Sequence, residues 1–337
     1  MFRPTRSIIA ALVLLLPLAA TAQSSTERDK EREAERVQRL REQRDAAAER
    51  ARDRAERDRD RKRERDAGSL DTVVTFDARG TVSVSCPGGA VIVNAGTANE
   101  VRVRARTESG GIRFTSSSGR ATLEPQSGRG CSDGRFEITV PSGVRLTATT
   151  WSGSVAVHGV HGEMEVHAQS GDVEIRDAGD RLDVETLSGD VVIAGVKGEA
   201  TIRTVSGDLE FSGARGTVDI ETVSGDIRLR DVIAKQVRTH TTSGDITFQG
   251  AVLDAGRYEF NTHNGEIGLE LPADIGAELS ISTFNGGLES DFPITLKAGE
   301  HGIGSAQAKR LNFTVGRGTA RIIAETFSGD ITLRRRR

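Results

Sequence analysis

Apolar and polar residues alternate along most of the second half of the chain, and glycine turns interrupt the alternation at regular intervals. The turn motif Ser-Gly-Asp begins at Ser188, Ser206 and Ser224, so its period is 18 residues. Looser copies of the motif begin at Ser152, Ser170, Ser243, Asn264, Asn285 and Ser328. Alternation on both sides of a glycine turn predicts two half-buried β-strands per repeat.

Several positions at fixed distances from the turn keep their character in every copy. The sixth residue before the motif and the third residue after its first residue are apolar or aromatic throughout, and threonine stands two residues before it, with Ala168 as the one exception. The threonines are Thr150, Thr186, Thr204, Thr222, Thr241, Thr262, Thr283 and Thr326. Such columns form when equivalent residues stack about 4.8 Å apart. We therefore predict an all-β fold, a β-solenoid resembling a parallel β-helix, with coils of about 18 residues; an antiparallel meander of hairpins is the alternative.

The regular register covers only part of the chain, which divides into four predicted segments. They are a signal peptide (1–22), a charged helical spacer (23–67), N-terminal β coils with a cap (68–140) and regular solenoid repeats (141–337) with an irregular unit at 289–324. A final strand pair around Ser328-Gly329-Asp330 is expected to close the stack.

The first residues have the pattern of an export signal. Arg3 and Arg6 precede an apolar run from Ile8 to Leu18, and Ala20-Thr21-Ala22 matches a cleavage site. The apolar run is too short to span a bilayer, and no second run exists in the sequence. We predict an exported protein of the periplasm, cell surface or extracellular space, without a transmembrane segment.

The segment that follows is densely charged but almost neutral overall. From Thr26 to Asp66 it contains 16 Lys or Arg and 14 Asp or Glu among 41 residues. Arg, Glu and Ala favour helix, which predicts an isolated charged α-helix or a partly disordered spacer. The apolar a and d positions of a coiled coil are missing. Neither this balanced segment nor the acidic remainder favours binding of nucleic acid.

Only two cysteines occur, Cys86 and Cys131. An exported chain meets an oxidising compartment, so a disulfide between them is predicted, with two separate thiols as the alternative. Neither cysteine lies in a local motif of thiol catalysis.

The serial turns carry a resemblance to a known family. Val140-Pro141-Ser142-Gly143-Val144, then Trp151-Ser152-Gly153, then repeated Thr-x-Ser-Gly-Asp units follow an export signal. Over roughly Leu70 to Leu333 the chain resembles the bacterial putative adhesin domain family of unknown function. The resemblance implies an exported β-helix-like protein with an adhesive or cell-envelope role, and it brings no catalytic residues.

The third position of the motif forms a column of carboxylates, namely Asp172, Asp190, Asp208, Asp226 and Asp245. Stacked like charges repel, so each carboxylate needs a hydrogen bond, screening or a cation. The favoured interpretation is that each Asp bonds within its own turn. Weak binding of calcium along this edge is the alternative.

The residue just before the motif is apolar in most copies although strand parity points it outward. The apolar members are Trp151, Leu187, Val205, Val223, Phe284 and Phe327; Gln169, Thr242 and His263 complete the column. Packing beneath the turn is the favoured interpretation, and an exposed ridge that contacts a partner or a second copy is the alternative.

Repetition argues against catalysis, because carboxylates that recur in coil after coil, such as Glu165, Asp183 and Asp219, fit a solvated acidic face better than a glycosidase pair. We predict no catalytic residues and no cofactor. The leading hypothesis is a non-enzymatic protein that contacts a protein or polysaccharide of the cell envelope or a surface. A self-associating envelope scaffold, a homo-oligomer, is the alternative, and a carbohydrate-active β-helix enzyme ranks last.

Overall fold

The computed structural model describes residues 32–33, 36, 38–39, 41, 43–57, 68–108, 110–126, 134–293 and 309–336. The chain divides into two compact units, Met1–Lys62 and Arg63–Arg337. In the first unit residues 43–57 are α-helical and exposed. The predicted signal peptide and Cys131 lie outside the described residues. Within the described ranges, no helix combines the length and the apolar character needed to cross a membrane.

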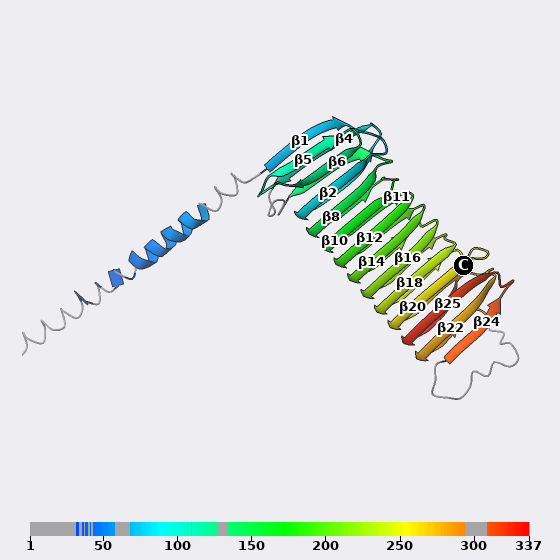
Figure 1. The fold of residues 1–337 in the computed structure, drawn as a ribbon. Helices are drawn as coiled ribbons and strands as arrows, with labels where there is room; N and C mark the ends of the chain where they lie inside the picture. Colours follow the sequence, from blue (N-terminus) through cyan, green and yellow to red (C-terminus); the bar gives the residue numbers. More distant parts are fainter. Residues whose placement is uncertain are drawn as a thin grey trace, which may run out of the picture. The chain divides into compact units, whose positions relative to one another are not determined.

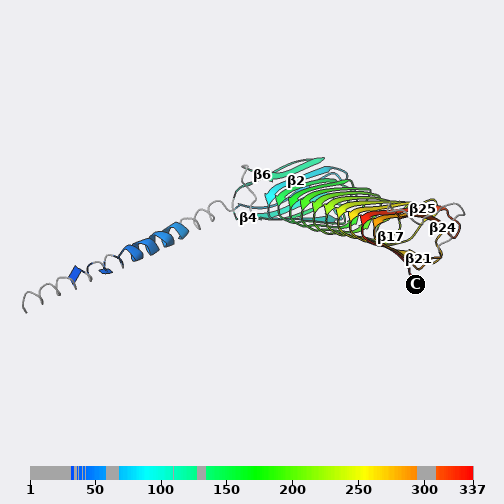
Figure 2. The ribbon, with the colours of Figure 1, turned by 90° about the horizontal axis from the view of Figure 1, so that it is seen from below.

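The second unit consists of two sheets of 13 strands each that face one another along one stack (Figures 1 and 2). Sheet A contains, in spatial order, β1 (Gly68–Thr75), β4 (Glu100–Thr107), β7 (Arg135–Pro141), β3 (Ala90–Gly96), β9 (Val155–His158), β11 (Val173–Ala178), β13 (Val191–Val196), β15 (Leu209–Ser212), β17 (Ile227–Val232), β19 (Ile246–Gly250), β21 (Ile267–Pro272), β26 (Ile331–Arg336) and β23 (Leu288–Ser290). Sheet B contains β24 (Lys309–Val315), β22 (Ala277–Asn285), β25 (Ala320–Ser328), β20 (Arg257–Asn264), β18 (Gln236–Ser243), β16 (Thr217–Ser224), β14 (Glu199–Ser206), β12 (Arg181–Ser188), β10 (Met164–Ser170), β8 (Arg145–Ser152), β2 (Thr81–Gly88), β6 (Arg120–Pro125) and β5 (Ile112–Ser117).

Each regular coil is one strand of sheet B, a glycine turn and one strand of sheet A. The strands stack in parallel with the register of the sequence repeat: Ser188 of β12 pairs with Ser206 of β14, which pairs with Ser224 of β16. The predicted β-solenoid is confirmed.

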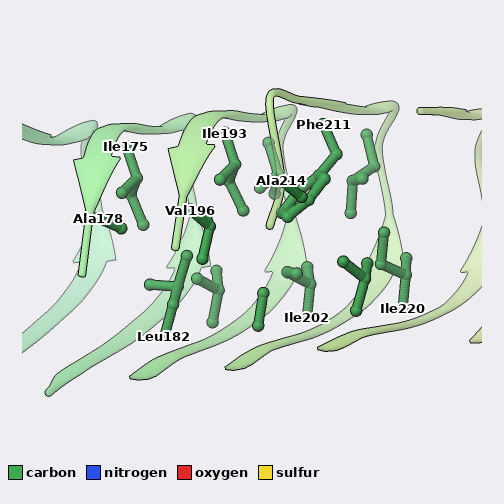
Figure 3. Close-up of a cluster of buried hydrophobic side chains, with 14 of the residues drawn as sticks. Ile175, Ala178, Leu182, Ile193, Val196, Ile202, Phe211, Ala214 and Ile220 are labelled. Carbon is green, nitrogen blue, oxygen red and sulfur yellow. The ribbon is translucent and has the colours of Figure 1, made fainter. Parts of the chain in front are cut away.

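The core lies between the two sheets and is built from the apolar columns. Leu182 and Ile202 of sheet B face Ile193 and Phe211 of sheet A, and all four are fully buried (Figure 3). Ala214 is buried as well and lines the side where the chain returns to sheet B. Burying one such large apolar side chain contributes about 1.5–3 kcal/mol, so the same contacts, repeated coil after coil, hold the stack together.

The threonine column is buried, as the sequence pattern predicts. Several hydroxyls donate to the carbonyl of a motif glycine in the neighbouring coil: Thr262 to Gly244, Thr283 to Gly329 and Thr326 to Gly265, each at 3.1 Å. These three hydroxyls link one coil to the next, whereas Thr186 and Thr222 donate to Ser188 and Ser224 of their own coils at 3.5 Å.

The strands at the N-terminal end break the parallel pattern. In sheet A β4 runs antiparallel to β1 and β7, and in sheet B β5 runs antiparallel to β6. Cys86 of β2 is buried and stands in register with Thr150, so it occupies a position of the threonine column.

The C-terminal end of the stack does not follow the order of the sequence. The expectation that the last strand pair closes the stack is wrong, because β25 pairs with both β20 and β22, and β26 pairs with both β21 and β23 (Figure 1). The last coil is inserted between its two predecessors, and β24, antiparallel to β22, ends sheet B. Because all these coils carry the same columns, the inserted coil matches both neighbours in register.

Candidate contact surface

The motif glycines form the corner at which each coil turns from sheet B to sheet A. Gly207 has a φ of 131°, a region that L side chains rarely adopt, and a Cβ placed there would lie 2.1 Å from the Gly189 carbonyl oxygen. Only glycine lets successive corners stack this closely. The corner therefore aligns the motif residues of all coils in straight columns.

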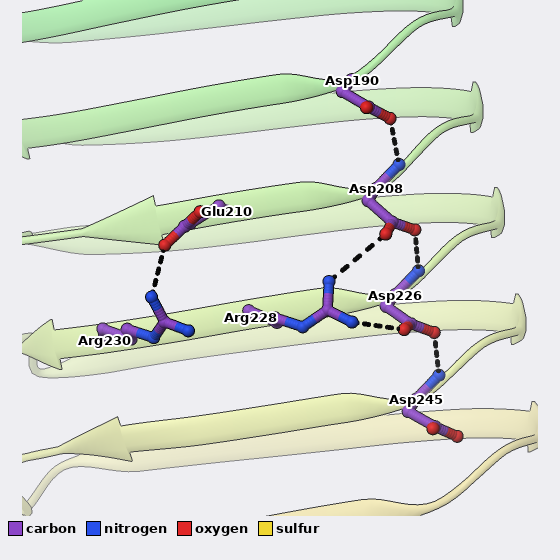
Figure 4. Close-up of polar contacts among 7 residues, drawn as sticks. All are labelled: Asp190, Asp208, Glu210, Asp226, Arg228, Arg230 and Asp245. Atoms are coloured by element: carbon purple, nitrogen blue, oxygen red, sulfur yellow. Dashed lines mark hydrogen bonds and ion pairs between the residues drawn. The ribbon is translucent and has the colours of Figure 1, made fainter.

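The motif aspartates bond from one coil to the next (Figure 4). Oδ1 of Asp190 accepts the backbone N–H of Asp208 at 2.9 Å, Asp208 accepts that of Asp226 at 3.0 Å, and Asp226 accepts that of Asp245 at 2.9 Å. Asp172 and Asp245 continue the same ladder. The interpretation that each Asp bonds within its own turn is wrong, since every acceptor serves the next turn in the stack.

Arg228 neutralises part of this ladder. Its guanidinium lies 3.3 Å from Oδ2 of Asp208 and 2.7 Å from Oδ2 of Asp226. The pKa of Asp208 lies below its ordinary value of 3.8, first because the Asp226 amide donates to the carboxylate and also because Arg228 pairs with it. The hydrogen bond of Arg228 to Asp208, together with the negative charges of Asp226 and Asp208, raises the pKa of Arg228.

Backbone amides and arginine thus account for the Asp column. Among the described residues, no three His, Cys, Asp or Glu side chains gather into a group that could hold a metal ion. The carboxylates that face outward on sheet B pair with cations: Arg203 lies 3.9 Å from Asp183, and Arg238 lies 3.8 Å from Asp219. These contacts are those of a solvated, ion-paired face.

The residues just before the motif form an exposed ridge that crosses the strands of sheet B at their C-terminal ends, beside the glycine corners. In stack order the ridge is Trp151, Gln169, Leu187, Val205, Val223, Thr242, His263, Phe327 and Phe284. Trp151 is 66% exposed, Val223 51% and Phe284 49%. The favoured interpretation, packing beneath the turn, is wrong, because strand parity carries these side chains outward up to the corner itself.

The ridge ends in a stack of three rings. His263 and Phe327 are stacked with ring centroids 4.8 Å apart, and so are Phe327 and Phe284. Sequence order would place Phe284 next to His263; the inserted β25 places Phe327 between them. This cluster is absent from the sequence pattern, because only the strand order creates it.

A groove lies beside the other end of the ridge, over β8, β10, β12 and β14. It has a volume of about 530 Å³; Trp151, Leu187 and Val205 line it together with Ala168 and Gln169. The polar Gln169 interrupts the apolar ridge at this point, next to Ala168, the buried exception in the threonine column. Ala168 can be recognised in the sequence as the exception to the threonine column. The groove itself forms only because β8, β10, β12 and β14 lie side by side.

The predicted site residues thus fall into two columns at the same corner, the aspartates at the start of sheet A and the apolar residues at the end of sheet B. The predicted disulfide cannot be placed, because Cys131 lies outside the described residues, and it stays a prediction.

Comparisons with known proteins found similar solved structures and one family. Solved structures similar to this chain include one described as a putative adhesin from Bacteroides fragilis, with 14% identity, a TM-score of 0.36 and coverage of 79% of this chain and 96% of that one. Another is described as a putative lipid-binding protein from Parabacteroides distasonis, with 10% identity, a TM-score of 0.39 and coverage of 80% and 97%. No curated protein matches the chain. The model of the Toastrack DUF4097 family, a domain of unknown function, matches residues 105–334, and the chain belongs to this family.

Proposed function

We propose that this protein is an exported, non-enzymatic contact protein of the cell envelope, and that the ridge is its contact surface. The observation that carries the proposal is the exposure of six large apolar side chains in one row of nine residues, from Trp151 to Phe284, at one corner of the solenoid. Exposed apolar side chains that gather in a patch mark interaction sites, whereas scattered ones need no explanation.

The scaffold suits this role because its corners are rigid. Motif glycines, the Asp ladder and the buried threonines link each coil to the next, so the ridge is held in place before a partner arrives. A preorganised surface loses little conformational entropy on binding. The expected partner is a protein or polysaccharide of the envelope or of another surface.

A ridge variant tests the proposal. Leu187→Ser, Val205→Ser and Val223→Ser together remove the exposed apolar centre without touching the core. We expect retention of the purified protein on isolated envelopes to fall about tenfold, which corresponds to a loss of 1.4 kcal/mol. Digesting the envelopes beforehand with a protease or with glycan-cleaving enzymes distinguishes a protein partner from a polysaccharide.

The matched control is Val73→Ser, Val192→Ser and Ile233→Ser, which removes three apolar side chains of similar exposure, 44%, 39% and 44%, away from the ridge. Its retention should equal that of the unaltered protein. Equal retention of both triple variants, with circular dichroism unchanged, would contradict the proposed function.

A further inference from the structure

We propose that the ridge binds a second copy of this chain, with the two solenoids laid ridge to ridge in opposite directions. The proposal rests on the proposed function in that it uses the same surface, and it names the partner. Two features of sheet B support it: the shape of the ridge and the order of the charges beside it.

The two halves of the ridge differ in shape and complement each other. The half over β8 to β14 contains the groove between Trp151 and Leu187, whereas the half over β20, β25 and β22 contains the projecting rings of His263 and Phe327. A copy running in the opposite direction brings rings over the groove. A copy running in the same direction would bring groove over groove and leave both unfilled.

The charges beside the ridge also select the opposite direction. Two residues before the ridge lies a column that reads, in stack order, Thr149, His167, Glu185, Arg203, Glu221, His240, Asn261, Glu325 and Ser282. In a parallel pair whose two-fold axis runs along this column, every one of these residues would face its own counterpart, so that Glu185 would meet Glu185 and Arg203 would meet Arg203. Like charges brought together across an interface cost several kcal/mol.

Charge complementarity sets the register of the antiparallel pair. An axis through β16, the midpoint of the nine-residue ridge, would place Glu221 against Glu221, so the axis is set between β14 and β16, with β8, β10, β12 and β14 facing β25, β20, β18 and β16. A two-fold axis between β14 and β16 places Val205 against Val223 of the second copy, Trp151 against Phe327, and Gln169 above the groove floor against His263. In the adjoining column it places Arg203 against Glu221 and Glu185 against His240.

Arg203 is available for this contact. Its guanidinium lies 3.7 to 3.9 Å from Asp183, Glu185 and Glu221 of its own chain, and within the described part of the structure it makes no hydrogen bond to any of them. Its side chain is 52% exposed. A carboxylate from a second copy can therefore take the hydrogen bonds that these long ion pairs leave open.

The size of the surface is sufficient. Nine intervals of about 4.8 Å make the row from β2 to β22 about 43 Å long, and a strip from the ridge to the fifth residue before the motif spans four residues, about 13 Å. This corresponds to about 560 Å² per partner, or about 1,100 Å² in total, at the small end of specific interfaces. Closed two-fold pairing also leaves the opposite sheet, sheet A, free.

Charge exchange tests both the partner and the register. Light scattering on the purified protein should give the mass of a dimer. Arg203→Glu alone should weaken the dimer about a hundredfold, because two opposite-charge pairs become like-charge pairs at once; Glu221→Arg alone should do the same. An equimolar mixture of these two variants, one of them carrying a fusion that changes its mass, should recover a heterodimer, because both pairs are then complementary again.

Arg230→Glu is the control for a charge reversal elsewhere on the surface, since Arg230 lies in β17 of sheet A, is 56% exposed and pairs with Glu210 at 2.6 Å. It should leave the dimer unchanged. A monomeric mass for the unaltered protein, or any mass above a dimer, would overturn the proposal. Recovery with Glu185→Arg in place of Glu221→Arg would overturn the register, since that pairing needs an axis between β12 and β14.

The two proposals can fail separately. A monomeric protein whose envelope retention still depends on Leu187, Val205 and Val223 would leave the proposed function standing and remove the second copy as the partner. A dimer that the ridge variant dissociates without any loss of retention would do the reverse.

Discussion

The carboxylate of Asp208 accepts the backbone N–H of Asp226, at 3.0 Å, although the two residues are 18 positions apart in the chain. The turn of one coil is thus closed by the side chain of the coil before it. Stability at the corner is consequently a property of neighbouring coils and not of a single turn.

Removing one carboxylate of the ladder should weaken the stack measurably. We expect Asp208→Ala to lower the free energy of unfolding by about 1 kcal/mol, because the Asp226 amide loses its acceptor. Asp208→Asn, which keeps an acceptor oxygen, should cost less. Glu210→Ala is the control, since Glu210 makes only an exposed ion pair with Arg230 and should cost about 0.5 kcal/mol or less. Denaturant unfolding measures all three, and equal losses for Glu210→Ala and Asp208→Ala would contradict the ladder.

The same ladder predicts sensitivity to acid. The pKa of Asp208 is lowered from 3.8 in the folded protein, so its ionised form stabilises the fold fully above that value. This contribution disappears as the pH falls through the lowered folded pKa. The midpoint temperature of unfolding should therefore fall when the pH is lowered below about 4. The difference in midpoint temperature between the unaltered protein and Asp208→Asn should narrow over the same pH range. A difference that stays constant down to about pH 2 would argue against an ionised acceptor.

Corner glycines should tolerate no side chain. Gly207→Ala would place its Cβ 2.1 Å from the Gly189 carbonyl oxygen at a φ of 131°, so we expect a loss of at least about 3 kcal/mol. Gly268→Ala is the matched control, because no atom lies within 4 Å of the added Cβ. Thermal unfolding measures the loss of stability in the two variants. Equal losses would mean that the corners can move apart to accept a side chain.

The inserted last coil predicts an unusual response to truncation. A chain that ends at Thr319 loses β25 and β26, with the buried Ile322 and Leu333, and leaves β20 and β22 without their shared partner. We expect hydrogen exchange to show loss of protection throughout β20 to β23. A chain that ends at Leu333 loses only the terminal arginines and should keep this protection. Retained protection in the chain that ends at Thr319 would mean that β22 can pair directly with β20.

Much of the fold could be predicted from the spacing of residue types. Alternation around Ser188, Ser206 and Ser224 determines which side chains enter the core, and the threonine column determines that coils stack in register. The exposure of Val205 also follows from parity alone, although its apolar character favoured burial. The side chain stays exposed because the strand remains extended up to the corner glycine, and successive side chains of an extended strand point to opposite faces of the sheet.

What the sequence by itself determined is therefore the coil: its length, its glycine corner and its inward and outward columns, all of which depend on neighbours in the chain. Only the tertiary structure decided which coil lies on which. Asp208 bonds to the next turn, Phe327 stands between His263 and Phe284, and Arg203 lies at the middle of the charged column. The reason is that the inserted coil carries the same columns as its two neighbours, so its place between them leaves no local pattern in the sequence.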